Sequence, residues 1–105
     1  MNKKQIKQTL IDNITILEHY GVEKQIPVWI EEMSELTKVL CKWQRKKELN
    51  RELIANLNEE ISDVIICLDQ LRYYIGDNEK DMMDRYKAKV DRQIQRIEKE
   101  QNDMI

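Results

Sequence analysis

The chain has few residues that interrupt helices. Its 105 residues include two glycines, one proline and no phenylalanine. β-Rich folds need many tight turns, and glycine and proline supply most of them, so this shortage argues against such a fold. A chain of this length forms one small domain, which buries roughly 65% of the surface that its unfolded form exposes. We therefore expect an all-α fold.

The sequence has few of the residues that several classes of catalytic site need. The sequence has one histidine, His19, and two serines, Ser34 and Ser62. A serine–histidine–carboxylate triad would depend on that single imidazole, so we set this class of enzyme aside. His19 stands at the end of a predicted helix, where we expect a capping or surface role.

The two cysteines, Cys41 and Cys67, are far apart in the sequence, and each lies in an apolar run. This placement predicts reduced cysteines in the core rather than a disulfide or a CxxC metal site.

Charge and hydropathy argue against two kinds of partner. Eighteen basic and 20 acidic side chains give a net charge of −2, and both signs are spread along the chain, so we expect no general basic surface for nucleic acid. The longest apolar run, Val64 to Leu68, is far too short to span a membrane, and no hydrophobic signal core follows the first lysines. We expect a soluble, cytoplasmic protein that binds neither nucleic acid nor membrane.

Amphipathic segments separated by helix-ending residues predict four helices. Gly21 and Gly76 each follow such a segment and end it. Pro27 is tolerable in or near the first turn of the second segment, and Asp77 or Asn78 can cap the fourth. The predicted helices cover about residues 3–20, 23–45 and 51–75, and from the last cap to about residue 100.

The least marked boundary lies between the second and third helices, where Asn50 is the only evident turn residue. Without a break, one helix of about 49 residues would extend roughly 73 Å, which is too long to pack in a chain of this size. We therefore predict an antiparallel, four-helix bundle-like single domain spanning residues 1–105, completed by oligomerisation.

Both central helices carry acids on the face that should be apolar. Glu32 and Glu35 share an arc of roughly 140° with the apolar residues of the second helix, and Glu60 and Asp63 share one face with those of the third. An unpartnered carboxylate is costly to bury, so core faces rarely contain one for structural reasons alone. The apolar residues concerned are Val28, Trp29, Leu36, Val39, Leu40 and Trp43 on the second helix and Leu53, Leu57, Val64, Cys67, Leu68 and Leu71 on the third.

The two acidic segments are also alike as sequences, since residues 31–35 read Glu-Glu-Met-Ser-Glu and residues 59–63 read Glu-Glu-Ile-Ser-Asp. In each, the inward acids are three residues apart, which places them one turn apart on one helix face. The midpoint between the segments falls near Lys47 and Glu48, so an antiparallel hairpin brings all four carboxylates to about the same height. Two such charges about 5 Å apart repel by roughly 3 kcal/mol at an effective dielectric near 20, so a cation is expected between them.

Four oxygen ligands without histidine or thiolate suit a hard cation, Mg²⁺, with Mn²⁺ as a substitute. A ferritin-like di-iron site needs Glu-x-x-His pairs, and here Glu35 and Asp63 stand where the histidines would be. A water-filled polar seam, or protonated acids in a plain bundle, is the other interpretation.

A basic stripe lies on the predicted fourth helix, where Arg85, Lys89, Arg92 and Arg96 fall within an arc of about 60°. Alone, such a stripe is typical of a solvated face. Beside a cation held by carboxylates it indicates a polyphosphate substrate, because Mg²⁺ is often bound by carboxylates together with substrate phosphates. The neighbouring packing face consists of Tyr86, Val90, Ile94 and Ile97.

These motifs resemble the signature of the MazG-like, all-α nucleoside triphosphate pyrophosphohydrolases, which is Glu-Glu-x-x-Glu, a spacer, then Glu-x-x-Asp. The first half reads Glu31-Glu32-Met33-Ser34-Glu35, and the second reads Glu60-Ile61-Ser62-Asp63. The resemblance implies Mg²⁺ ligands at four positions. Glu31 lies off the apolar arc, so it is a weaker candidate, with an outer role. The implied ligands, which are also the implied catalytic residues, are Glu32, Glu35, Glu60 and Asp63.

The likeness extends to about residues 22–97. It includes Lys24-Gln25 and the Leu-Asp-Gln-Leu run at 68–71. In the last helix, family members often show a Lys, then a basic residue and an Asn, then an Arg, and Gln93 stands in place of the Asn. The implied phosphate-binding residues are Lys89, Arg92 and Arg96.

The resemblance implies hydrolysis of a nucleoside triphosphate between the α and β phosphates, in the upkeep of the nucleotide pool. Glu32 or Glu35 would orient the attacking water, and Trp29 or Trp43 are candidates to stack on the base, although a tryptophan on an apolar stripe is more often core. Such proteins usually form dimers or tetramers, so we expect a homodimer or homotetramer. The alternative is a noncatalytic helical bundle that acts as an interaction module, which predicts no inward acids.

Overall fold

The computed structural model of the chain describes residues 1–76 and 78–104. Within these ranges the protein is all-α, without strands, and its helices are α1 (Lys3–Tyr20), α2 (Val22–Lys46), α3 (Arg51–Ile75) and α4 (Glu79–Asp103). The predicted fold class is confirmed, and the observed helix boundaries lie within three residues of the predicted ones. No helix in the described part of the chain has both the length and the apolar character of a membrane span.

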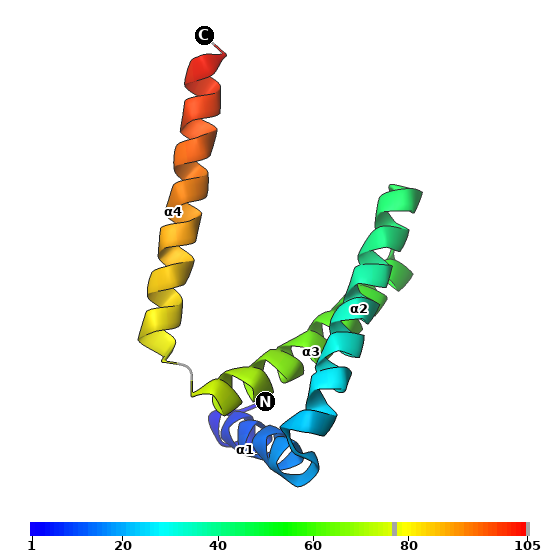
Figure 1. Cartoon of the computed structure of the whole chain (residues 1–105). Helices are drawn as coiled ribbons and strands as arrows, with labels where there is room; N and C mark the ends of the chain where they lie inside the picture. The colour runs from blue at the N-terminus through cyan, green and yellow to red at the C-terminus, as the bar shows by residue number, and fades with distance from the viewer. Residues whose placement is uncertain (77, 105) are drawn as a thin grey trace. The chain divides into compact units, whose positions relative to one another are not determined.

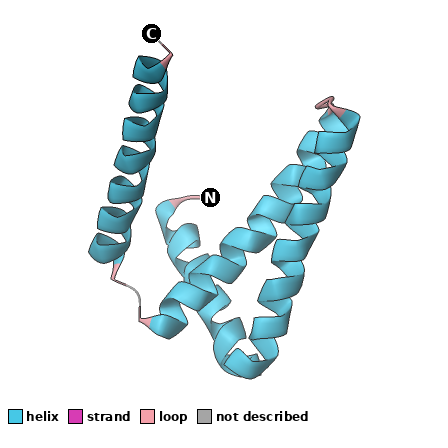
Figure 2. Cartoon of the chain, turned by 45° about the horizontal axis from the view of Figure 1, so that its top comes forward, coloured by secondary structure: helices cyan, strands magenta, loops and turns pink. Residues whose placement is uncertain are grey.

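The chain divides into two compact units, Met1–Ile75 and Gly76–Ile105, and each is described by itself. In the first unit, α2 and α3 run side by side in opposite directions as a helical hairpin (Figure 1). Helix α1 packs against both of them, near the end of the hairpin that lies away from the α2–α3 turn (Figure 2). The first unit is therefore a small three-helix assembly built around one antiparallel pair.

A single glycine joins α1 to α2. Gly21 donates its N–H to the carbonyl of Leu17 at 2.8 Å, and its own carbonyl accepts the N–H of Gln25 at 3.1 Å. Its φ of +84°, like the +67° of Gly76 at the end of α3, is a conformation that side chains disfavour. Both glycines end helices as predicted. Pro27 is the sixth residue of α2 and so lies just past the first turn.

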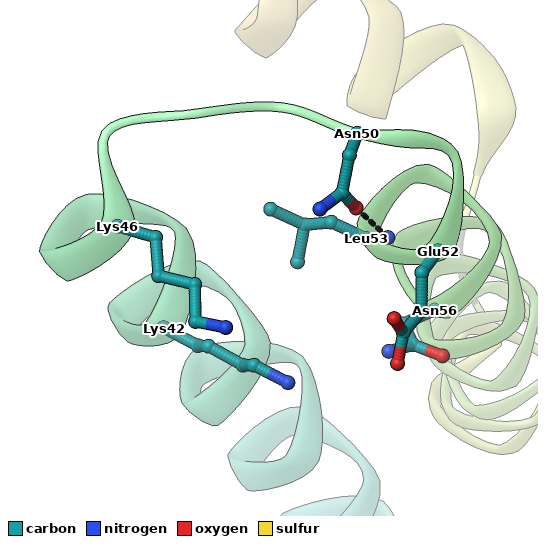
Figure 3. Close-up of a pocket in the computed structure, with 6 residues that line it drawn as sticks. All are labelled: Lys42, Lys46, Asn50, Glu52, Leu53 and Asn56. Atoms are coloured by element: carbon teal, nitrogen blue, oxygen red, sulfur yellow. Dashed lines mark hydrogen bonds between the residues drawn. The ribbon is translucent and has the colours of Figure 1, made fainter.

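Residues 47–50 separate α2 from α3, as predicted. Lys47 adopts a left-handed conformation with φ +56°, and its N–H bonds to the carbonyl of Trp43 at 2.8 Å. The side-chain oxygen of Asn50 accepts the N–H of Leu53 at 2.8 Å and caps the start of α3 (Figure 3). The cavity beside this turn measures about 20 Å³, which is room for about one water molecule.

The buried core of the first unit is small. Leu17, Trp29 and Cys67 form one cluster in which each residue is only 3–4% exposed, and Leu53 is buried nearer the turn. Both cysteines are free, but Cys41 is exposed, so the prediction that it belongs to the core is wrong. At 100° per residue, Cys41 lies about 120° around α2 from Trp29, which takes it off the face that packs on α3. A short apolar run on a helix covers more than one face.

Helix α4 begins at a side-chain cap. The side-chain oxygen of Asn78 accepts the N–H groups of Lys80 at 2.9 Å and Asp81 at 3.3 Å. Asn78 is one of the two predicted caps, and the other, Asp77, lies outside the described residues. Three ion pairs between residues four apart run along the helix and join Lys80 to Asp84, Asp81 to Arg85, and Lys87 to Asp91.

Candidate metal centre

Three of the predicted acids meet between α2 and α3. One carboxylate oxygen from each of Glu32, Glu60 and Asp63 lies within 4.8 Å of the other two, and all three residues are partly buried. Two oxygens on opposite sides of one Mg²⁺ are about 4.2 Å apart when each bond is about 2.1 Å. The three oxygens are thus separated by little more than the span of a single small cation.

Burial and like charge act together on this cluster. Burial is the main cause that raises the pKa of Glu32 above its ordinary value of 4.5, and the charges of Asp63 and Glu60 and a hydrogen bond with Asp63 add to it. Burial also raises the pKa of Glu60, followed by the charges of Asp63 and Glu35. Both carboxyl groups therefore hold a proton more firmly than a free glutamate does, which indicates a site short of positive charge.

One atom of the cluster lacks a partner. Glu60 Oε2 is buried and accepts no hydrogen bond from the described residues. Buried polar atoms nearly always have a partner, so an exception calls for an explanation such as an ion. The orphaned oxygen and an oxygen-only donor set fit Mg²⁺ or Mn²⁺.

A thiol lies close to the acids without joining the donor set. Burial, and then the charges of Glu32 and Asp63, raise the pKa of Cys67. Among the described residues, the ligand atoms that gather within 4.8 Å of one another belong to Glu32, Glu60 and Asp63 and do not include Cys67 Sγ. The gathered donors are therefore all carboxylate oxygens.

The fourth predicted acid, Glu35, stands at the edge of the cluster. Its Oε1 accepts the Nζ of Lys38 at 3.0 Å, and its side chain is 40% exposed. Its charge still reaches Glu60, whose pKa it helps to raise. Glu31, which lies off the apolar arc and for which an outer role is predicted, is exposed on α2.

Four buried polar side chains bond to one another beside the acids, and we call them the Gln70 network. Gln70 Oε1 accepts the Nε1 of Trp29 at 2.8 Å and the Nε2 of Gln25 at 3.0 Å. Gln70 Nε2 donates to Asn13 Oδ1 at 2.8 Å, and Asn13 Nδ2 donates to the carbonyl of Ile66 at 3.1 Å. The exposed fractions of the four residues are only 2–9%, and their bonds tie all three helices of the first unit together.

Sequence reasoning missed the Gln70 network, although a signal was present. Gln25 lies four residues before Trp29, and Gln70 lies three residues after Cys67. Both amides therefore share a helix face with a core residue, which is the same pattern that revealed the acids.

A cleft of about 190 Å³ connects the acids to the Gln70 network. Carboxylates and amides supply its polar lining, and branched aliphatic side chains supply much of the rest. Its lining residues are Ile16, Gln25, Val28, Glu32, Asp63, Ile66, Cys67 and Gln70.

A search with the chain against protein-family models, curated proteins and solved structures returned no match. The resemblance carried by the motifs therefore stays a prediction, and the chemistry of the site has to be derived from its own residues.

The two tryptophans occupy different environments. Trp29 is 4% exposed, and its indole N–H is bonded to Gln70, so this side chain is a core residue and a base contact there does not fit the structure. Trp43 is 37% exposed, and it lies about 16 Å along α2 from Glu32 at 1.5 Å per residue. A base contact at Trp43 stays a prediction.

The predicted basic stripe lies on α4, where its members are all exposed. Arg85 is paired with Asp81 at 3.2 Å, and Arg96 Nη1 donates to Gln93 Oε1 at 3.4 Å. Among the described residues, Lys89, Arg92 and Arg96 form no ion pair. These three side chains keep their charge available for an anion.

Proposed function

We propose that the protein is a Mg²⁺-dependent nucleoside triphosphate pyrophosphohydrolase. The reaction cleaves the bond between the α and β phosphates of a ribo- or deoxynucleoside triphosphate and releases a nucleoside monophosphate and pyrophosphate. The observation that carries the proposal is the meeting of Glu32, Glu60 and Asp63, where one buried oxygen accepts no hydrogen bond from the residues that the structure describes. Such a group of acids is costly unless a cation binds to it. The acidic motifs at residues 31–35 and 60–63 follow the order of the MazG-like signature, and this resemblance supports a nucleoside triphosphate as the substrate.

In this proposal, Glu32, Glu60 and Asp63 hold Mg²⁺, or Mn²⁺ in its place. When bound, the cation supplies neutralisation of phosphate charge and a lower pKa for a water ligand. Glu35 orients the attacking water from the edge of the site and accepts its proton. The water oxygen attacks the α phosphorus, and the electrons of the broken bond leave with pyrophosphate.

Lys89, Arg92 and Arg96 hold phosphate oxygens as charge builds on the leaving pyrophosphate. The support for this role is that these cations have no carboxylate partner in the described part of the chain, whereas Arg85 is neutralised by Asp81. Replacing Arg92 by alanine is expected to raise KM for the triphosphate and to leave Mn²⁺ affinity unchanged.

We also propose that the protein is a homodimer or homotetramer in the cytoplasm, where its nucleotide substrates are found. The support is the large apolar side chains that stay exposed on each helix of the first unit, such as Leu10 at 50%, Ile30 at 61% and Ile65 at 52%. Extensive apolar surface marks interaction sites, and a second copy of the chain can cover it. Light scattering should give a mass of two or four chains, and a monomer at assay concentration would contradict this part of the proposal.

The same exposed apolar surface favours a second candidate function, a noncatalytic module that binds other proteins. That function gives no reason for three carboxylates to share a partly buried site. The two candidates therefore differ in what they predict for cation binding and for turnover.

A substrate panel tests the proposed function directly. The protein is incubated with Mg²⁺ and each of the common ribo- and deoxynucleoside triphosphates, while pyrophosphate and orthophosphate are assayed separately. Pyrophosphate as the first product is expected with at least one substrate. Absence of Mg²⁺-dependent turnover would leave the noncatalytic interaction module as the better hypothesis. Orthophosphate as the first product would exclude cleavage between the α and β phosphates. The variant Glu60→Gln, purified in the same way, controls for contaminating phosphatases.

A further inference from the structure

We infer that Gln70 is a positioning residue whose bonds to Trp29 and Gln25 set the register of α2 against α3 and thereby the spacing of the three carboxylates. This inference rests on the proposed function, since it concerns the same cation site. Gln70 itself is not among the predicted ligands.

The register of the α2–α3 hairpin links the Gln70 network to the acid cluster. Gln25 of α2 bonds to Gln70 of α3 at 3.0 Å, and further along the pair Glu32 of α2 meets Asp63 of α3. Glu32 follows Gln25 by seven residues on α2, and Asp63 precedes Gln70 by seven residues on α3. Seven residues span about 10.5 Å of helix, so the bond between Gln25 and Gln70 also fixes the position of Glu32 relative to Asp63.

The bonds of Gln70 select one register. Its oxygen accepts two donors from α2, and its nitrogen donates to Asn13 of α1. Gln70 is 2% exposed, so water cannot replace these partners, and a buried donor or acceptor without a partner is unfavourable. Sliding α2 by one turn, about 5.4 Å, would break both of its bonds to Gln70. The same slide exceeds the 4.8 Å within which the carboxylate oxygens are gathered.

Apolar packing alone leaves the register less well defined. The buried apolar cluster that joins the three helices consists of Leu17, Trp29 and Cys67, and contacts between such side chains have no preferred direction. Hydrogen bonds are directional, and Trp29 takes part in both the cluster and the Gln70 network. The directional contribution to the register therefore comes from the Gln70 network.

The experiment measures Mn²⁺ affinity by electron paramagnetic resonance for the wild-type chain and for Gln70→Leu, a variant of similar size that cannot form these bonds. The expected result is an affinity about tenfold lower or worse, the effect typical of losing a group that orients metal ligands. The control is Leu53→Ala, which removes a buried side chain near the turn without touching the Gln70 network. The control should unfold at a lower temperature and keep the wild-type affinity.

A milder variant keeps the inference testable if Gln70→Leu does not fold. Trp29→Phe keeps an aromatic ring and removes one donor to Gln70, and we expect it to lower Mn²⁺ affinity by less than Gln70→Leu does. Wild-type affinity in a folded Gln70→Leu, or in Trp29→Phe if Gln70→Leu does not fold, would overturn the inference, whatever happens to the unfolding temperature. Absence of Mn²⁺ binding by the wild-type chain would overturn both the metal site and the inference. Mn²⁺ binding with the expected losses, but without turnover of any triphosphate, would overturn the proposed reaction alone.

Discussion

Two polar regions lie next to each other between α2 and α3, and they differ in how their polar atoms are satisfied. In the Gln70 network, donors and acceptors come from the same chain, and each of its four side chains takes part in a hydrogen bond. The acid cluster has acceptors in excess, and within the described ranges of the chain Glu60 Oε2 is buried without a hydrogen bond. A buried polar group is therefore evidence for a ligand when its partners are missing, rather than because it is polar.

The strongest test of the Gln70 network is Trp29→Ala. It removes a 4% exposed aromatic ring and a donor to Gln70, so we expect the free energy of unfolding to fall by about 3–5 kcal/mol. Urea unfolding followed by circular dichroism measures the change. The matched control Trp43→Ala, at a 37% exposed position, should cost less than about 1 kcal/mol. Equal losses would contradict the buried, hydrogen-bonded position of Trp29.

The acid cluster should respond mainly in activity. Glu60→Gln keeps the size of the side chain and removes a ligand charge, so Mg²⁺-dependent turnover should fall by at least about 100-fold. Steady-state release of pyrophosphate measures the effect. Glu59→Gln, on the exposed side of the same helix, is the control and should keep the wild-type rate. Full activity in Glu60→Gln would contradict the ligand assignment, and full activity in Glu35→Gln would contradict its proposed role in orienting the water.

Stability without divalent cations should also separate the two regions. The pKa values of Glu32 and Glu60 are raised in the folded chain, so between 4.5 and the raised values the folded chain binds more protons than the unfolded chain. The contribution of these groups to stability is therefore present at low pH and is lost as the pH rises through that window.

Thermal unfolding in a chelator, measured against pH, tests this sign. The unfolding temperature of Glu60→Gln should rise relative to wild type as the pH increases from about 4.5, and added Mg²⁺ should reduce the difference by stabilising wild type. A difference that shrinks with rising pH in the chelator would contradict the proposed repulsion. Leu53→Ala, which removes a buried side chain near the turn and no titrating group, should not show this pH dependence.

The smallest effect is expected at the edge of the cluster. Lys38 and Glu35 form an exposed pair three residues apart on α2, with side-chain exposures of 71% and 40%. Pairs of this kind contribute about 0.2–0.5 kcal/mol, so Lys38→Ala should barely change the free energy of unfolding measured in urea. A loss as large as that of Trp29→Ala would show that the pair belongs to the buried contact between α2 and α3.

The helix boundaries could be predicted because they depend on local chemistry. Gly21 and Gly76 adopt positive φ angles that favour glycine, and the cap at Asn50 uses a bond to a residue three positions away. The prediction for Cys41 was wrong because an apolar run says which residues are apolar and not which face they occupy. The face follows from counting around the helix.

The acid cluster was partly predictable, and the Gln70 network was not predicted. Spacing along each helix and the position of the turn bring Glu32, Glu60 and Asp63 together, since these relations involve only helix geometry. Glu35 pairs with Lys38, three residues further along α2, and spacing alone allows this pairing as well as a place in the cluster. Glutamines are usually surface residues, so the role of Gln70 is clear only when its donors from α2 and its acceptor from α1 are seen around it.

The position of the α2–α3 turn has a consequence for protein engineering. Lys47 and Asn50 each cap a helix through a neighbour in the sequence, while the bonds that set the register lie at the opposite end of the hairpin. Chain continuity at residues 47–50 is therefore not what aligns the two helices. We expect that a chain cut there would yield two fragments that reassociate when mixed and regain the cation site, so the protein offers a natural position for a split reporter.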